Sequence, residues 1–540
     1  MRKWLPLVAV CLGTFMLLID VTIVNVALPD MVVDLHASFG SLQWVVDAYA
    51  LALAALVLGT GSIADLAGHR RAYLAGLVVF AASSVACGLA PDPAALIAAR
   101  AVQGAGAAAM FATTFALLNS SYTGRDRGTA YGLWGAVSGA SSAVGPVLGG
   151  LLTEGASWRW IFFVNLPVSV AAIALVRLVF SDARGPAGRG VDSREVDSRE
   201  VDGREVGGRG VDVPGMASFT AAAGCATYAL IRANEHGWSN SLVWWLLGSA
   251  AVLLAVFVAA QAHARHPMLD LALLHDRSFV GVLVAGLLMT FAAFAAFTYT
   301  SIWLQSVLGL SPIKAGLTSL PMSVMAFSVS AMLGRPLHRL RPGLVIGAGL
   351  LVIGAGDALV AGLVRGAAGW PALMPGLAVI GVGVGVVMPV LGSATMAFVP
   401  PRRGGMAAGA GNTTRQLGFA FGIAALGSVF TAGARGELSG RGVAGVSGVA
   451  RAVAGGRAPS LLDAAPAGTG RVLGAAVRAA AVAGVRGTYA VAAAVGLVAG
   501  VLVLVLMRPG RAATGSAATH ARGAAARPGS GEQREGVPVR

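Results

Sequence analysis

The sequence has little charge for its length. Of its 540 residues only 12% are charged and 56% are hydrophobic, and the mean hydropathy is +0.75. A soluble domain carries roughly twice that share of charged residues on its surface. The composition therefore excludes a soluble globular protein and indicates a chain that lies mainly in lipid.

Lysine and cysteine are also scarce. Neither of the two lysines, Lys3 and Lys314, stands in a Gly-Lys-Ser or Gly-Lys-Thr context, so a single-chain ATP-driven pump is excluded. Cys11, Cys87 and Cys225 are widely spaced inside apolar runs, which indicates neither a disulfide framework nor a metal site. The histidines lie between apolar runs or at their ends, so we expect no enzyme and no cofactor.

Apolar runs that could cross a membrane are abundant. Each is about 18 to 25 residues long, enough to span a hydrocarbon core of roughly 30 Å as a helix. We predict an all-α integral membrane protein of about fourteen transmembrane helices, near residues 5–27, 42–62, 72–90, 95–118, 129–152, 161–180, 215–232, 242–262, 278–300, 314–333, 343–364, 372–396, 408–431 and 487–507.

A charged five-residue repeat, Val-Asp-Ser-Arg-Glu, divides these runs into six before it and eight after it. It fits no helix face and is typical of a disordered linker. We predict two six-helix bundles with two additional helices between them. The expected parts are a first bundle at 1–180, a cytoplasmic linker at 181–213, two additional helices at 214–277, a second bundle at 278–507 that includes a long outer loop at 433–480, and a basic disordered cytoplasmic tail at 508–540.

Arginines fall between the runs and not on one face, which argues against nucleic acid. Most of them lie on one side if the N-terminus is inside, as the positive-inside rule requires. The sequence therefore predicts a multi-pass protein of the cell membrane with both termini in the cytoplasm.

Asp20 and Arg100 are charges within apolar runs. A charged residue at membrane depth is costly, so each should face a polar interior, where they are natural partners. An acid there can load and release a proton as its access to water alternates. The alternative is a permanent structural ion pair. Gln103 lies one helical turn from Arg100, and Gly104 would allow a neighbouring helix to approach closely.

Two glycine-rich motifs accompany this pair. Gly61, Asp65, Gly68, Arg70 and Arg71 form a tight turn in which the acid and the arginines could latch the cytoplasmic side, although an ordinary positive-inside loop explains the arginines as well. The fifth run has small residues at four-residue spacing and an internal proline, which predicts close helix packing, a kink and, by extension, a gate or seal at Gly139, Gly145, Pro146, Gly149 and Gly150.

Together these residues resemble the major facilitator superfamily, specifically its fourteen-helix drug/proton antiporter branch. The resemblance covers nearly the whole chain. It rests on segments 20–29, 43–46, 61–71, 100–104, 139–150, 158–167 and 412–418 in this order. It implies two bundles that alternate access to a central cavity, proton coupling through Asp20 and Arg100, a cytoplasmic gate at the 61–71 turn and an antiporter motif at 139–150.

Candidate substrate contacts are Asp47, Phe291, Phe294 and Met322. Aromatic and thioether side chains suit an adaptable pocket for flat lipophilic ligands, although helix packing or contact with lipid is the favoured explanation of these residues. Asp47 departs from the family pattern and is either a cation contact or a second proton site. For Asp357, another acid at membrane depth, no partner is evident.

The expected function is secondary active export of hydrophobic or cationic drugs, dyes or antibiotics in exchange for protons, with no ATP and no nucleic acid. Two alternatives remain open. One is a major facilitator permease or exporter for a specific metabolite or amino acid. The other is a membrane sensor or scaffold without transport, which a folded soluble domain would favour.

Overall fold

The computed structural model describes residues 2–180, 212–264, 267, 269–337, 340–366, 368–397, 404–465 and 469–507. Within these ranges the regular structure is all helical, and they contain no strand. Residues 181–211, which make up most of the predicted linker, and the predicted tail at 508–540 lie outside the described residues.

The first bundle is formed by helices that run up and down in turn. Ser38 caps the second helix by accepting a hydrogen bond from the Ser41 amide, and Asp92 caps the fourth in the same way before Pro93, a residue suited to a first turn. The helices are α1 (Leu5–Asp34), α2 (Phe39–Ala67), α3 (His69–Gly88), α4 (Pro93–Ser121), α5 (Gly124–Gly155), α6 (Trp160–Phe163) and α7 (Asn165–Val179).

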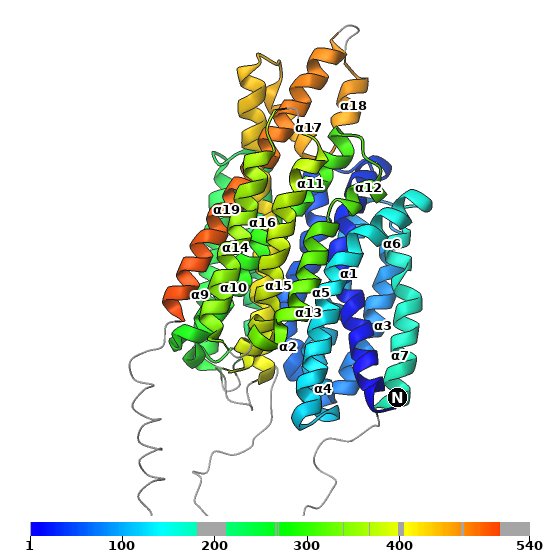
Figure 1. Ribbon diagram of the computed structural model, residues 1–540, viewed down its shortest axis with the longest axis vertical. Helices are drawn as coiled ribbons and strands as arrows, with labels where there is room; N and C mark the ends of the chain where they lie inside the picture. The colour runs from blue at the N-terminus through cyan, green and yellow to red at the C-terminus, as the bar shows by residue number, and fades with distance from the viewer. Residues whose placement is uncertain are drawn as a thin grey trace, which may run out of the picture.

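The second bundle lies beside the first (Figure 1). Its first predicted span is interrupted after Ala293, so that two helices replace one. Its elements are α10 (Arg277–Ala293), α11 (Ala296–Ile302), the π-helical η3 (Trp303–Val307), α12 (Pro312–Leu317), α13 (Leu320–Leu337), α14 (Pro342–Leu363), α15 (Met374–Ala397), α16 (Gly404–Gly440), α17 (Val446–Ala454), α18 (Ala458–Asp463) and α19 (Gly470–Leu506), with short 3₁₀ turns η1 (Arg2–Trp4), η2 (Leu271–His275) and η4 (Trp370–Leu373).

The two additional helices, α8 (Val213–His236) and α9 (Ser241–His263), form an antiparallel pair. α8 packs on both α2 and α16, so the pair covers the seam between the bundles from outside. The Trp44 ring of α2 packs against the Tyr228 ring of α8, with centroids 6.0 Å apart and the ring planes tilted by 49°. The pair therefore lies against the bundles without entering the space between them.

All fourteen predicted segments are mainly helical, and those at 161–180, 278–300 and 314–333 each contain two helices. Eleven helices of the described residues are long and apolar enough to cross a membrane. α2, α5 and α8 are not among the eleven, so the count of fourteen spans remains a prediction.

The segment at 433–480 differs from the expected outer loop. We call the end of the molecule at which α1 begins the near end, and the opposite end the far end. α16 and α19 are each 37 residues long, about 55 Å at 1.5 Å per residue, and so exceed a hydrocarbon core of about 30 Å. Together with α17 and α18 they extend past the other helices at the far end, at the top of Figure 1. The predicted loop is therefore largely helical, and the helix that contains the last predicted span begins at Gly470.

Small residues let α4 fit between α2 and α3. A methyl group on Gly104 would collide with the Tyr49 carbonyl of α2, and one on Gly106 would lie 2.7 Å from the Phe80 amide nitrogen of α3. Backbone atoms cannot move aside as a flexible side chain can. The glycines of α4 are therefore required for the close approach of three helices in the first bundle.

We predict opposite signs for two Gly→Ala substitutions. In an open helix position, alanine stabilises by about 1 kcal/mol relative to glycine. Gly224→Ala in α8 has nothing within 4 Å of the added methyl group and should raise the unfolding temperature of the purified protein. Gly106→Ala should lower it, because the added carbon meets the α3 backbone. A stabilised Gly106→Ala protein would contradict this account of the packing.

Candidate functional site

Asp20 and Arg100 form a buried ion pair inside the first bundle. The Asp20 carboxylate is 0% exposed and the Arg100 guanidinium 1% exposed, and Arg100 Nη1 lies 2.5 Å from Asp20 Oδ2. The guanidinium also donates from Nε to the Val45 carbonyl at 3.0 Å and from Nη1 to Gln103 Oε1 at 2.7 Å. Its charge is thus satisfied by one carboxylate and two neutral oxygens.

The second carboxylate oxygen is held by two amides. Asp20 Oδ1 accepts hydrogen bonds from Gln103 Nε2 at 3.0 Å and from Asn165 Nδ2 at 2.9 Å. Both amides also donate to Ser84 Oγ, at 2.8 Å from Gln103 and 3.3 Å from Asn165. The network therefore joins α1, α3, α4 and α7 at one point.

Sequence reasoning missed three members of this network as site residues: Tyr49, Ser84 and Asn165. The Tyr49 ring lies 4.3 Å from Arg100 Cζ, a cation–π contact in a dry environment. Asn165 and Ser84 are polar side chains in apolar runs, which was the available signal, since such residues seek partners at membrane depth. Nothing in the sequence indicated that they would meet Asp20.

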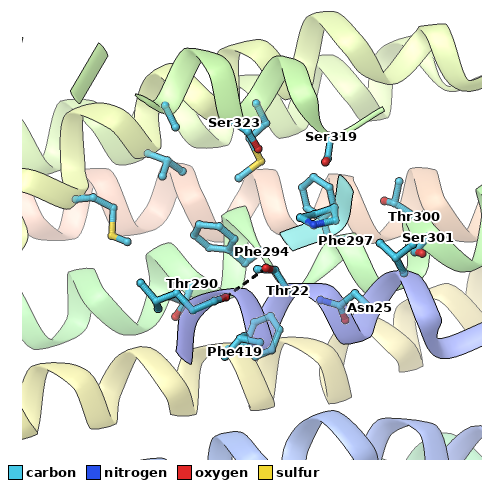
Figure 2. Close-up of a pocket in the computed structure, with 18 of the residues that line it drawn as sticks. Thr22, Asn25, Thr290, Phe294, Phe297, Thr300, Ser301, Ser319, Ser323 and Phe419 are labelled. Carbon is cyan, nitrogen blue, oxygen red and sulfur yellow. Dashed lines mark hydrogen bonds between the residues drawn. The ribbon is translucent and has the colours of Figure 1, made fainter. Parts of the chain in front are cut away.

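A large cavity lies between the two bundles. It encloses about 1390 Å³, part of which is continuous with solvent. Figure 2 shows that aromatic rings and small hydroxyl groups surround it. The labelled lining residues come from α1, from the broken α10–α11 segment, from α13 and the turn before it, and from α16. They are Thr22, Asn25, Thr290, Phe294, Phe297, Thr300, Ser301, Ser319, Ser323 and Phe419.

The cavity continues toward the near end. A second space of about 930 Å³ shares Leu18, Phe111, Met388 and Arg415 with the first. Its other lining residues include Trp134 in the first half of α5 and several residues from Gly409 to Asn412 near the start of α16. The two spaces together extend from the middle of α1 toward the near end of the molecule.

Contacts between the bundles close the far end. Gln305 Nε2 donates to the Val26 carbonyl at 2.8 Å, and Thr298 Oγ1 donates to Asn25 Oδ1 at 3.0 Å. Gln43 Nε2 donates to the Tyr299 hydroxyl at 3.0 Å. These three bonds connect α1 and α2 with the α11–η3 segment, on the far-end side of the cavity.

The glycine ridge of α5 belongs to this closure. A methyl group on Gly150 would lie 2.6 Å from Ile313 Cα of α12, and one on Gly149 would lie 2.9 Å from the Ile23 carbonyl of α1. A methyl group on Gly145 would collide with the Thr22 hydroxyl of α1, and one on Gly316 of α12 would collide with the Pro146 carbonyl. Gly139 also lies in α5. The ridge therefore packs against α1 on one side and against the second bundle on the other.

One helix connects the ion pair and the cavity. Asp20 points from α1 into the first bundle, whereas Leu18, Val21, Thr22 and Asn25 of the same helix line the cavity. Asp20 does not line it. A change in the charge of Asp20 could therefore reach the cavity through a shift or rotation of α1 and not through contact with a ligand.

The candidate substrate contacts divide into two groups. Phe294 and Met322 line the cavity. Phe291 and Asp47 are not among its lining residues, because Phe291 packs beside Gly422 of α16 and Asp47 is fully buried within the helices. Neither carboxylate oxygen of Asp47 has a hydrogen-bond partner among the described residues, and the same is true of Asp357.

The turn between α2 and α3 depends on Gly68, whose φ of +94° favours glycine. Arg70 Nη2 donates to the Arg177 carbonyl at 3.5 Å, which ties the turn to α7, and Arg71 is exposed. Gly61 lies in α2. The Asp65 side chain lies outside the described residues, so its proposed contact with Arg71 stays a prediction.

We expect the two neutral variants of the ion pair to differ in stability. Asp20→Asn leaves a guanidinium that cannot lose its charge, whereas Arg100→Gln leaves a carboxylate that can take up a proton. Removing one member of a buried pair costs about 3 to 5 kcal/mol when the other stays charged. Thermal unfolding should show that Asp20→Asn is less stable than Arg100→Gln. The double variant should lose less stability than the sum of the losses of the two single variants. Strict additivity would show that the charges are not coupled.

Comparison with known proteins shows which family and which characterised proteins this chain is similar to. Residues 10–423 match the Major Facilitator Superfamily. The chain is 34% identical over 430 residues to the multidrug resistance protein Stp of Mycobacterium tuberculosis (strain CDC 1551 / Oshkosh), which covers 79% of this chain and 76% of that protein. It is 36% identical over 438 residues to the puromycin resistance protein pur8 of Streptomyces alboniger, covering 80% of this chain and 82% of that one. It is 30% identical over 428 residues, 79% and 76% of the two chains, to the tetracenomycin C resistance and export protein of Streptomyces glaucescens.

Solved structures agree on the fold. The structure is similar to that of a bacterial homolog of the human lysosomal transporter Spinster in an inward-facing conformation, with a TM-score of 0.59, 14% identity and coverage of 94% of this chain and 97% of that one. It is also similar to the human organic anion transporter MFSD10, with a TM-score of 0.56, 14% identity and coverage of 93% and 99%. The two bundles, the cavity between them and the match over most of the chain agree, and the protein is a membrane transporter that belongs to the Major Facilitator Superfamily.

Proposed function

We propose that this transporter exports lipophilic small molecules of the antibiotic class across the cell membrane in exchange for protons. The observation that supports it is the buried Asp20–Arg100 pair on the helix whose other face lines the cavity. The similarity to resistance and export proteins for puromycin and tetracenomycin C supports the substrate class.

Proton uptake by Asp20 is the proposed switch. A protonated Asp20 no longer neutralises Arg100, so the guanidinium must rely on the Val45 and Gln103 oxygens alone. The resulting imbalance favours a conformation in which α1 and α4 are arranged differently, and substrate in the cavity favours the original one. Because Asp20 is fully buried in the conformation described, this rearrangement must also admit water to it.

The direction of transport follows from the proposed topology. With both termini in the cytoplasm, the near end faces the cytoplasm and the closed far end faces outside. The cavity then extends toward the side from which an exporter loads its substrate. The proton gradient supplies the energy, with no ATP and no cofactor.

We expect Asp20→Asn to abolish gradient-driven transport. The assay is uptake of puromycin and tetracenomycin C into everted vesicles under an imposed pH gradient. The matched control is Asp34→Asn in the same helix, because Asp34 is also ion-paired, to Arg159, but is 46% exposed. The control should retain transport, since exposed ion pairs contribute little. Undiminished uptake by Asp20→Asn under a gradient would refute coupling through this residue.

Closure of the far end generates a further prediction. Gly150→Val places side-chain atoms against the α12 backbone, so the far end should not close and net transport should fall by about tenfold or more. Gly155→Val at the end of the same helix has nothing within 4 Å and should transport normally. Substrate binding to purified Gly150→Val protein should persist. Normal transport by this variant would show that α5 and α12 need not meet.

A further inference from the structure

Among the described residues that line the cavity between the bundles, one is charged. Arg415 of α16 lines both the main space and its continuation toward the near end. The remaining described lining residues of both spaces are apolar, or are neutral polar residues such as Thr22, Asn25 and Gln416. The described lining thus presents a positive charge and no carboxylate to a ligand.

Among the described residues, none carries a negative charge that neutralises Arg415. Its Nη2 donates to Asn412 Oδ1 at 3.3 Å, and no carboxylate among the described residues forms an ion pair with it. This differs from Arg100, whose charge is matched by Asp20. A guanidinium in an apolar cavity with a single neutral acceptor has unused donors, and an anionic group is the ligand that satisfies them best.

The backbone holds Arg415 in place. Its carbonyl accepts a hydrogen bond from Thr290 Oγ1 at 2.6 Å, and Gly286 of α10 leaves room for its aliphatic stem, since a methyl group there would lie 3.2 Å from Arg415 Cγ. Phe419 follows one helical turn later on the same face of α16 and also lines the cavity, as do Phe294 and Phe297 (Figure 2). The charge and the aromatic rings therefore line the same cavity.

We propose that the substrate is an amphipathic organic anion, with a flat apolar body among the aromatic rings and an acidic group on Arg415. This rests on the proposed export function and specifies its substrate class. It disfavours the lipophilic cations that the sequence resemblance suggested, because a cation in this cavity would meet a like charge without a counter-ion. Arg415 is a specificity-determining residue and takes no part in the Asp20 network.

The test compares two probes that share one ring system. 8-Anilinonaphthalene-1-sulfonate is an anion, and N-phenyl-1-naphthylamine is its neutral counterpart without the sulfonate. Binding to the full chain in lipid nanodiscs is measured by equilibrium dialysis, with empty nanodiscs subtracted. Arg415→Gln should weaken binding of the sulfonate by about tenfold or more and leave binding of the neutral probe unchanged. Arg415→Lys, which keeps the charge, should retain most of the affinity.

Arg435→Gln is the control, because Arg435 lies on the same helix, is exposed and does not line the cavity. It should alter the binding of neither probe. An equal loss of both probes in Arg415→Gln would overturn the proposal, since Arg415 would then only shape the cavity. A wild-type protein that binds the neutral probe better than the sulfonate would overturn it as well.

Vesicle uptake separates this proposal from the export function. If ethidium and the neutral probe are transported under a pH gradient but the sulfonate neither binds nor moves, export stands and the anionic substrate is wrong. If the sulfonate binds through Arg415 but no probe is transported, the anion site stands and gradient-driven export of these compounds is wrong.

Discussion

The burial of two opposite charges, Asp20 and Arg100, constrains the whole first bundle. A guanidinium and a carboxylate removed from water each need several kcal/mol of compensation, and only close contact together with further hydrogen bonds provides it. Four helices must therefore converge within hydrogen-bonding distance of one point. The glycines of α4 make this convergence possible, since larger residues would hold α2 and α3 away.

The burial of the ion pair also keeps it apart from the cavity, although a transporter must couple two such sites. The ion pair is enclosed in one bundle, whereas the cavity lies between the bundles and shares no residue with the pair. α1 takes part in both, with Asp20 on one face and Thr22 and Asn25 on the other. Under the proposed proton exchange, a ligand and a proton would therefore influence one another through the position of a helix, without competing for the same atoms.

The far end and the near end have different structures for a physical reason. At the far end, glycines of α5 bring backbone against backbone, and hydrogen bonds such as that from Gln305 to the Val26 carbonyl join the bundles. Toward the near end the bundles are separated by the cavity, with Arg415 where its two spaces meet. A rocking motion of two bundles requires close contact at one end and open space at the other. The small residues and hydrogen bonds at the far end and the cavity toward the near end meet these two requirements.

The all-helical membrane architecture, the position of each long helix and the pairing of Asp20 with Arg100 could be predicted from the sequence. These follow from local quantities, namely the length of an apolar run and the high cost of an unpaired charge in lipid. Helix ends beyond the membrane were less predictable, because α16 and α19 continue as helices in an alanine- and glycine-rich region whose apolar residues are interrupted by arginines.

Which side chains meet depends on the packing of the helices. Helices that are apolar on every side give no indication of which face turns inward, so a rotation of one residue exchanges packing and cavity positions. Phe294 lines the cavity whereas Phe291 packs beside α16, Asn165 bonds to Asp20 while Ser84 accepts from Gln103 and Asn165, and Arg415 lies in the cavity with no ion pair to a described carboxylate. These outcomes depend on how helices distant in sequence pack, which is a property of the assembled bundles and not of any single run.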